Sequence, residues 1–237
     1  PHVVSLFGTG CCGDINHVDP SRKERNKTDF IGQSLGATLR HALPRVKPVE
    51  STKLQVGTAV VKIPLQEVTE EMLAAARPIL TEARAGKTVD FLEQVRGYKN
   101  LMVDQLRHRR SVDDASRLLG WGLSHAWGGI GNELPLEVTS ITLGNDVAIV
   151  LLPGEVFVDL GLAIKRGSPF QTTLVIELCN AVETVYIPTR SAYAGGSYEV
   201  TNSALEPGAG EALVEAALKQ LRMAAAAAVA PKKAGAP

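Results

Sequence analysis

The sequence predicts an α/β fold in which a mixed β-sheet has helices packed on its faces. Two patterns indicate this class. Residues 136–152 contain two apolar strands joined by Gly-Asn-Asp, which is typical of a β-hairpin. A helical stretch at 154–165 then leads to a mostly apolar strand at 172–178, and this strand–helix–strand order favours a parallel crossover within a buried sheet. We find no internal repeat and no domain linker before the C-terminal tail.

Four further elements are predicted in the first quarter of the chain. Residues 2–8 form an apolar run that ends in glycine, as a strand entering a tight turn would, and residues 8–27 lack any period and form a long loop. Asp29 is expected to cap a helix closed by Pro44, whose apolar residues are Phe30, Ile31, Leu35, Leu39 and Leu43. Alternation over 54–65 predicts a strand.

Two helices should interrupt the strands, and a third should close the fold. Thr69 is expected to begin a helix that reaches Ala85, with Pro78 kinking or splitting it, and a second helix spans about 90–110. The last helix is predicted over about 210–228. We therefore expect one domain over 1–223, followed by an alanine-rich, disordered tail over 224–237.

Composition excludes several classes of protein. The 237 residues are 45% hydrophobic, and 25 basic side chains balance 25 acidic ones, so no net field attracts nucleic acid. No apolar run approaches the roughly 20 residues that a transmembrane helix needs. The chain begins at Pro1 and shows no signal peptide, and we interpret it as a fragment. Adjacent Cys11 and Cys12 suit core filling better than a disulfide framework, which leaves their redox state open.

Glu155 is the first candidate for chemistry, because it lies where a strand leads into the helix predicted at 154–165. Ligands of α/β sheets usually bind at the carboxyl ends of strands, which favours a binding role. A purely structural interpretation is equally physical, since an acid in the first turn of a helix stabilises its dipole by about 0.3 to 1 kcal/mol. Local sequence does not choose between the two.

A tyrosine-rich loop provides the second candidate. Three of the four tyrosines, Tyr186, Tyr193 and Tyr198, follow the strand at 172–178 in a segment with Pro188 and two glycines. Loop residues clustered beyond a strand end are often functional. Alternatively, their rings cover the core and their hydroxyls face water.

The loop over Gly8 to Asp19 is a third candidate. Its glycines allow close backbone approach, and its polar residues are Asp14, Asn16, His17 and Asp19, which could bind a metal or orient other ligands. An Asx-rich structural turn explains the same residues. His41 and His108 lie on predicted helices with no acid at ligand spacing, and His125 lies between two tryptophans. The zincin motif H-E-x-x-H is absent from the sequence.

Three segments carry a resemblance to a known family. They are GCCGDINHVD at 10–19, LPGEVFVDLG at 152–161 and YIPTRSAYAGGSYE at 186–199. In this order they resemble the neutral/alkaline non-lysosomal ceramidases, in particular divergent bacterial members. The resemblance extends from Val3 to about Arg222 and corresponds to the C-terminal part of the catalytic domain.

The resemblance implies a zinc amidase that cleaves the amide of ceramide, or of a similar lipid, into a sphingoid base and a fatty acid. Carried over by motif, Glu155 and Tyr186 would be zinc ligands. Tyr198 would be a catalytic tyrosine that binds the carbonyl oxygen of the substrate. The resemblance further implies secretion or a periplasmic or cell-surface location, and transient contact with a membrane surface.

The chain also departs from the family. The two zinc histidines of the family belong to segments upstream of the loop at 10–19, so they are expected before Pro1. The five histidines of this chain match neither of the family's two zinc-histidine segments; they are His2, His17, His41, His108 and His125. Thr9 to Cys12 replace a serine-containing stretch, and the family's immunoglobulin-like domain has no counterpart. The fragment alone is therefore expected to be inactive, and two alternatives stay open: a binding or scaffold protein, and a zinc hydrolase of another amide or an ester.

Overall fold

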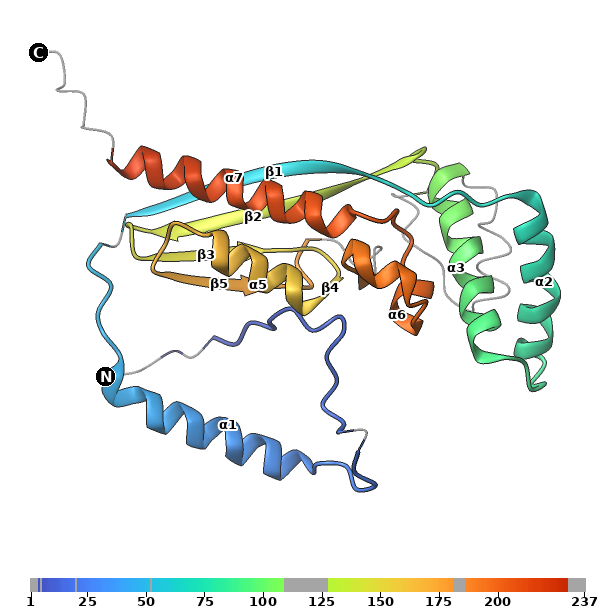
Figure 1. The fold of residues 1–237 in the computed structure, drawn as a ribbon, viewed down its shortest axis with the longest axis horizontal. Helices are drawn as coiled ribbons and strands as arrows, with labels where there is room; N and C mark the ends of the chain where they lie inside the picture. Colours follow the sequence, from blue (N-terminus) through green and yellow to red (C-terminus); the bar gives the residue numbers. More distant parts are fainter. Residues whose placement is uncertain are drawn as a thin grey trace, which may run out of the picture.

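A four-stranded mixed sheet forms the centre of the protein (Figure 1). The computed structural model describes residues 4, 6–19, 21–51, 53–108, 128–180 and 186–229. The strands lie in the order β1-β2-β3-β5, with bounds β1 Leu54–Pro64, β2 Glu133–Leu143, β3 Val147–Leu151 and β5 Thr172–Ile176. β1, β2 and β3 are antiparallel in succession, whereas β5 is parallel to β3. The predicted α/β class, hairpin and parallel crossover are confirmed.

Two helices cover one face of this sheet. They are α5, Val158–Gly167, and the long C-terminal helix α7, Ala209–Val229 (Figure 1). Alternate residues of β2, including Leu136 and Val138, are buried beneath them. The Gln220 side chain of α7 donates a hydrogen bond to the Val138 carbonyl at 2.8 Å and accepts one from the Ser140 hydroxyl at 2.8 Å. These bonds tie α7 to a specific position along β2.

The opposite face of the sheet differs from the prediction of a buried sheet. Because side chains alternate along a strand, the residues between the buried ones share this second face. Leu54, Val56, Val60 and Leu174 lie there with 48–62% of their surface exposed. Within the described ranges, helices cover only the other face of the sheet.

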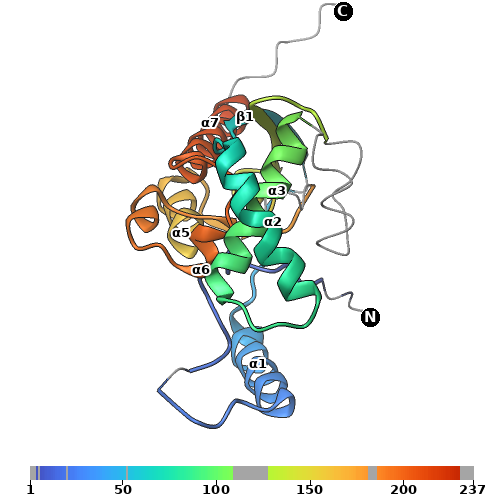
Figure 2. The same ribbon diagram turned by 90° about the vertical axis from the view of Figure 1, so that its right-hand side faces the viewer.

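The predicted helical interruption forms a hairpin of two packed helices beyond one end of the sheet (Figure 2). These are α2, Glu70–Arg84, and α3, Phe91–His108. Thr69 caps α2 as expected, since its hydroxyl accepts from the Met72 amide at 3.3 Å. Of the two outcomes predicted for Pro78, a kink or a split, the split is wrong, because α2 continues through this residue as one helix.

The N-terminal part of the chain lies apart from the sheet. α1, Thr28–Ala42, buries none of its residues in the described structure, and it lies away from the sheet in both views (Figures 1 and 2). It begins one residue before Asp29, so Lys27 rather than Asp29 occupies the capping position. A short 3-10 helix η1, Leu43–Arg45, follows.

The predicted strand over 2–8 is not observed in its described part. Val4 and residues 6–8 have no strand partner, and Leu6 and Phe7 are 92% and 87% exposed. An apolar run becomes a strand only where another strand pairs with it, and no described segment does so here. Residues 1–3 and 5 lie outside the described residues.

The remaining elements are short. Two-residue strands β4, Glu155–Val156, and β6, Tyr186–Ile187, form a second sheet, followed by the 3-10 helix η2, Arg190–Ala194, and by α6, Tyr198–Thr201. α7 then continues to Val229, beyond the boundary at 224 that was predicted for the tail. Among the helices in the described ranges, none is both long and apolar enough to cross a bilayer.

Candidate functional site

Glu155 lies in strand β4 and not in a helix, which corrects the prediction of a helix over 154–165. α5 begins only at Val158, so the interpretation of Glu155 as a first-turn acid is wrong. Gly154, with φ of +65°, turns the chain directly before β4. β4 pairs in parallel with β6, and the register places Glu155 opposite Tyr186. Two residues 31 positions apart in the sequence therefore become direct neighbours.

The side chains of Glu155 and Tyr186 interact with each other. Burial raises the pKa of Glu155, the hydrogen bond from Tyr186 lowers it, and the nearby charge of Glu177 raises it. Burial and the Glu155 charge together raise the pKa of Tyr186. Because an ionised carboxylate only accepts hydrogen bonds, the Tyr186 hydroxyl is the donor in this pair. The strand register thus produces a phenol–carboxylate pair.

Tyr198 joins this pair from the first residue of α6, rather than from a loop as predicted. Ser197 begins the short helix, and its hydroxyl accepts from the Val200 amide at 3.4 Å. The Tyr198 ring meets the edge of the Tyr186 ring, with centroids 5.7 Å apart and an interplanar angle of 74°. The structure therefore brings all three residues carried over by the resemblance, Glu155, Tyr186 and Tyr198, into one cluster.

Several residues of the cluster were missed by sequence reasoning. Phe91 stacks on Tyr198, with ring centroids 5.5 Å apart, and the Tyr98 hydroxyl forms a hydrogen bond with that of Tyr198. Asn202, which is 4% exposed, donates through Nδ2 to the Tyr198 hydroxyl at 3.5 Å. Tyr98 is the one tyrosine outside the predicted loop, and only the fold brings α3 to α6.

Tyr193, the other tyrosine of the predicted cluster, has a structural role. Its hydroxyl donates to the Leu205 carbonyl at 2.8 Å and lies 3.2 Å from the Ser203 hydroxyl. Burial raises its pKa. Tyr193 therefore secures the chain before α7. Its ring packs against the core, as the structural alternative expected, but its hydroxyl is hydrogen-bonded within the protein instead of facing water.

Glu177 is a second carboxylate beside Glu155, and no sequence pattern pointed to it. It follows β5 and is 2% exposed. Its Oε2 accepts from the Val156 amide at 2.6 Å, and its Oε1 accepts from the Cys12 thiol at 2.7 Å. Glu177 thus joins β4 to the loop that contains Cys12.

The loop over Gly8 to Asp19 forms hydrogen bonds with β4 and with the first residue of α5. The Gly13 amide donates to the Val156 carbonyl at 2.9 Å, and a Cβ at Gly13 would lie 2.5 Å from the Glu155 carbonyl oxygen, so this position requires glycine. Asp14 accepts from the Val158 amide at 2.7 Å and satisfies the first N–H of α5. Asn16 and Asp19 accept from amides two residues ahead. These contacts agree with the structural interpretation of an Asx-rich turn.

The three cysteines are free. Cys11 packs against the core, and burial raises its pKa to about 12. Burial and the hydrogen bond to Glu177 raise the pKa of Cys12 to about 11. Both thiols therefore stay protonated at neutral pH, a state in which they are poor nucleophiles and poor metal ligands.

The cluster places a carboxylate oxygen and a phenol oxygen side by side. Zinc in proteins usually has four ligands, among them carboxylate oxygens, so these two residues would need two further ligands to hold it. No group of three or more His, Cys, Asp or Glu side chains suitable for a metal occurs in the part of the chain that the structure describes. His108 was predicted to lack an acid, but its Nδ1 lies 3.1 Å from Asp104 Oδ1, one helical turn earlier. His2 and His125 lie outside the described residues.

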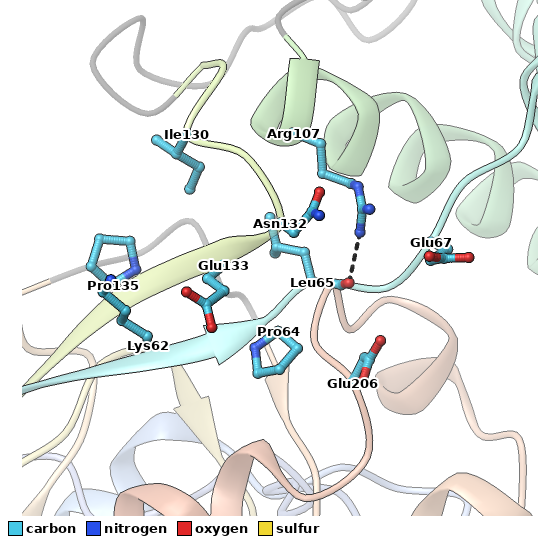
Figure 3. Close-up of a pocket in the computed structure, with 10 residues that line it drawn as sticks. All are labelled: Lys62, Pro64, Leu65, Glu67, Arg107, Ile130, Asn132, Glu133, Pro135 and Glu206. Carbon is cyan, nitrogen blue, oxygen red and sulfur yellow. Dashed lines mark hydrogen bonds between the residues drawn. The ribbon is translucent and has the colours of Figure 1, made fainter.

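A cavity of about 760 Å³ lies elsewhere, where β1 ends and α3 passes close to it (Figure 3). Arg107 points into it, and its Nη1 donates to the carbonyls of Leu65 and Gln66 at 2.9 and 3.1 Å. Lys62 and several glutamates add charge of both signs. None of the residues carried over by the resemblance lines this cavity, so size alone does not locate the candidate site.

No protein-family model and no curated protein matches this chain. Among solved structures, it is similar to the neutral ceramidase from Pseudomonas aeruginosa, with a TM-score of 0.42 and 15% sequence identity. The similarity covers 78% of this chain and 30% of that protein, so the chain spans less than a third of its length. These comparisons place the chain in no family.

Proposed function

We propose that this chain is part of the catalytic domain of a zinc-dependent amidohydrolase that cleaves the N-acyl amide of ceramide or a similar lipid. The observation that supports this most is the pairing of β4 with β6, which sets Glu155 against Tyr186. These are the two residues that the motif resemblance assigns to zinc. Had their side chains pointed to opposite sides of the sheet, no common ion could bind both.

Each residue of the cluster has a definite part in this proposal. A bound zinc ion would polarise an amide carbonyl and activate a water molecule. Glu155 and Tyr186 would hold the ion, together with two histidines expected outside this chain. Tyr198 would donate a hydrogen bond to the carbonyl oxygen as negative charge develops on it, which stabilises a transition state by about 3 kcal/mol.

The lipid substrate and the location are further parts of the proposal. Phe91, 61% exposed, stacks on Tyr198 and supplies an apolar surface beside the reacting group. Such a surface suits a substrate whose amide carries hydrocarbon chains. In line with the resemblance, we propose a secreted, periplasmic or cell-surface protein that contacts membranes transiently to reach its substrate.

The test uses the full-length protein, with zinc content and hydrolysis of a detergent-solubilised ceramide measured together. Glu155→Ala and Tyr186→Phe should each lose bound zinc, or lower kcat/KM by about a thousandfold or more, roughly 4 kcal/mol. Tyr193→Phe is the matched control, because it removes a hydrogen-bonded tyrosine hydroxyl outside the cluster. Normal zinc content and turnover in both site variants would refute the assignment.

The two alternatives predict different results in the same experiment. A scaffold protein that kept only the fold would contain no zinc in its full-length form and would hydrolyse nothing. A zinc hydrolase of another substrate would bind zinc through Glu155 and Tyr186 and would cleave a different amide or an ester, but leave ceramide intact.

A further inference from the structure

Tyr198 is contacted on several sides by residues of two other elements and by the residue that follows its own helix. Phe91 of α3 stacks on its ring with an interplanar angle of 22°, while Tyr186 of β6 meets it edge-on. Its hydroxyl is contacted by Tyr98 of α3 and by Asn202, which directly follows α6. Both the ring and the hydroxyl of Tyr198 are therefore held by neighbouring side chains.

Helix α3 supplies two of these contacts because of its register. Phe91 and Tyr98 are seven residues apart, which is close to two helical turns, so both side chains project from the same side of α3. That side faces α6, with which α3 packs. The α2–α3 hairpin lies between β1 and β2 in the sequence. Its helix α3 thereby forms one wall of the cluster.

One of the hydroxyl contacts has a defined direction. Asn202 Nδ2 is a donor, so the Tyr198 oxygen accepts there. The Tyr98 hydroxyl shares a hydrogen bond with the Tyr198 hydroxyl, and burial together with this bond raises the pKa of Tyr98. A phenol oxygen that accepts from Asn202 still carries its own proton, which it can donate to another partner.

We infer that Tyr98 and Phe91 are positioning residues for Tyr198. Phe91 fixes the plane of the Tyr198 ring, and Tyr98, with Asn202, directs the Tyr198 proton toward the acceptor oxygen of a ligand. A hydrogen bond donated to the Tyr198 oxygen also strengthens the hydrogen bond that the Tyr198 hydroxyl donates to the ligand, because linked hydrogen bonds polarise one another. The inference rests on the proposed function, in which that ligand oxygen is the carbonyl of an amide.

A double-mutant cycle in the full-length protein tests whether Tyr98 acts through Tyr198. Tyr98→Phe keeps the ring and should lower kcat on solubilised ceramide about tenfold, the factor of one ordinary hydrogen bond, with KM nearly unchanged. Tyr198→Phe should lower it about a hundredfold. Adding Tyr98→Phe to Tyr198→Phe should cost nothing further. Full additivity, or an equal loss in the control Tyr193→Phe, would overturn the inference.

A spectroscopic readout separates this inference from the proposed function. The Raman Fermi doublet of tyrosine reports whether a phenol donates or accepts, and subtraction of the Tyr198→Phe spectrum isolates the Tyr198 signal. We expect an accepting hydroxyl in the ligand-free protein and a clear change in Tyr98→Phe, whether or not ceramide is cleaved. An unchanged doublet, or a Tyr198 hydroxyl that already donates to Asn202, would overturn the inference.

The role of Phe91 is tested by a matched pair of exposed phenylalanines. Phe91 is 61% exposed and Phe30 of α1 is 58% exposed, but only Phe91 contacts Tyr198. Phe91→Leu should alter the Tyr198 doublet and lower kcat severalfold, whereas Phe30→Leu should change neither. Equal behaviour of the two variants would show that the stacked ring does not position Tyr198.

Discussion

Glu155 and Glu177 lie close enough for their charges to interact, but the fold uses them differently. Glu177 is 2% exposed, and each of its oxygens accepts a short hydrogen bond, one from the Val156 amide and one from the Cys12 thiol. Glu155 is partly exposed, and its one identified partner is the Tyr186 hydroxyl, which could itself bind a ligand. A buried carboxylate with all its bonds made stabilises structure, whereas one with spare bonding capacity is available for chemistry.

The two carboxylates are also physically connected. Glu177 bonds to the amide of Val156, the residue after Glu155, so it helps to set the position of the Glu155 backbone. Leu178, directly after Glu177, has φ of +58°, an unfavourable conformation for a bulky residue. The Leu178 amide donates to the Gly154 carbonyl at 3.1 Å, which ties this strained residue to the turn before β4.

The largest expected difference concerns stability. Glu177→Ala leaves the buried Val156 amide and the Cys12 thiol without an acceptor, and should lower the free energy of unfolding by about 2 kcal/mol. Glu155→Ala removes a partly exposed side chain and should change it by less than about 0.5 kcal/mol. Urea denaturation of both variants measures the contrast. Equal losses would show that the two carboxylates have the same structural role.

A smaller effect is expected from the thiol that contacts Glu177. Cys12→Ala removes one donor to the Glu177 carboxylate and should cost about 1 kcal/mol of unfolding free energy. Cys179→Ala is the control, because the Cys179 thiol makes only longer contacts, 3.4 and 3.9 Å from backbone carbonyls. A Cys12 variant as stable as the control would show that the thiol does not support Glu177.

The smallest expected effect is a pH dependence that belongs to Glu155 alone. Its pKa is raised above the ordinary value of 4.5, mainly by burial, so folding favours its protonated form. The stability that this provides is complete below pH 4.5 and is lost as pH rises through the raised pKa. In metal-free buffer, the wild type should therefore lose stability with rising pH relative to Glu155→Gln. A relative gain would contradict the direction of the shift.

Sequence patterns predicted the elements whose period is long enough to detect. The hairpin over β2 and β3, the crossover through α5 and the α2–α3 hairpin have alternation or helical periodicity over five residues or more. β4 and β6 have two residues each, so no period exists, and Glu155 was assigned to a helix. Motif resemblance nevertheless selected Glu155 and Tyr186, because it depends on residue identity and not on period.

Other features depend on tertiary contacts that a local pattern does not contain. Glu177 lies at the end of a strand with no motif around it, and its importance comes from Cys12, 165 positions earlier. Tyr98 resembles any aromatic residue on an amphipathic helix until α3 packs on α6. The apolar run over 2–8 fails for the same reason, since a strand needs a partner and its described residues have none.

The most direct test of the central claim is anomalous diffraction at the zinc edge from crystals of the full-length protein. The account predicts one zinc peak within about 2.2 Å of both a Glu155 carboxylate oxygen and the Tyr186 hydroxyl oxygen. A zinc peak that is distant from these two oxygens would contradict the account. So would the absence of zinc from protein that was expressed and purified in the presence of zinc.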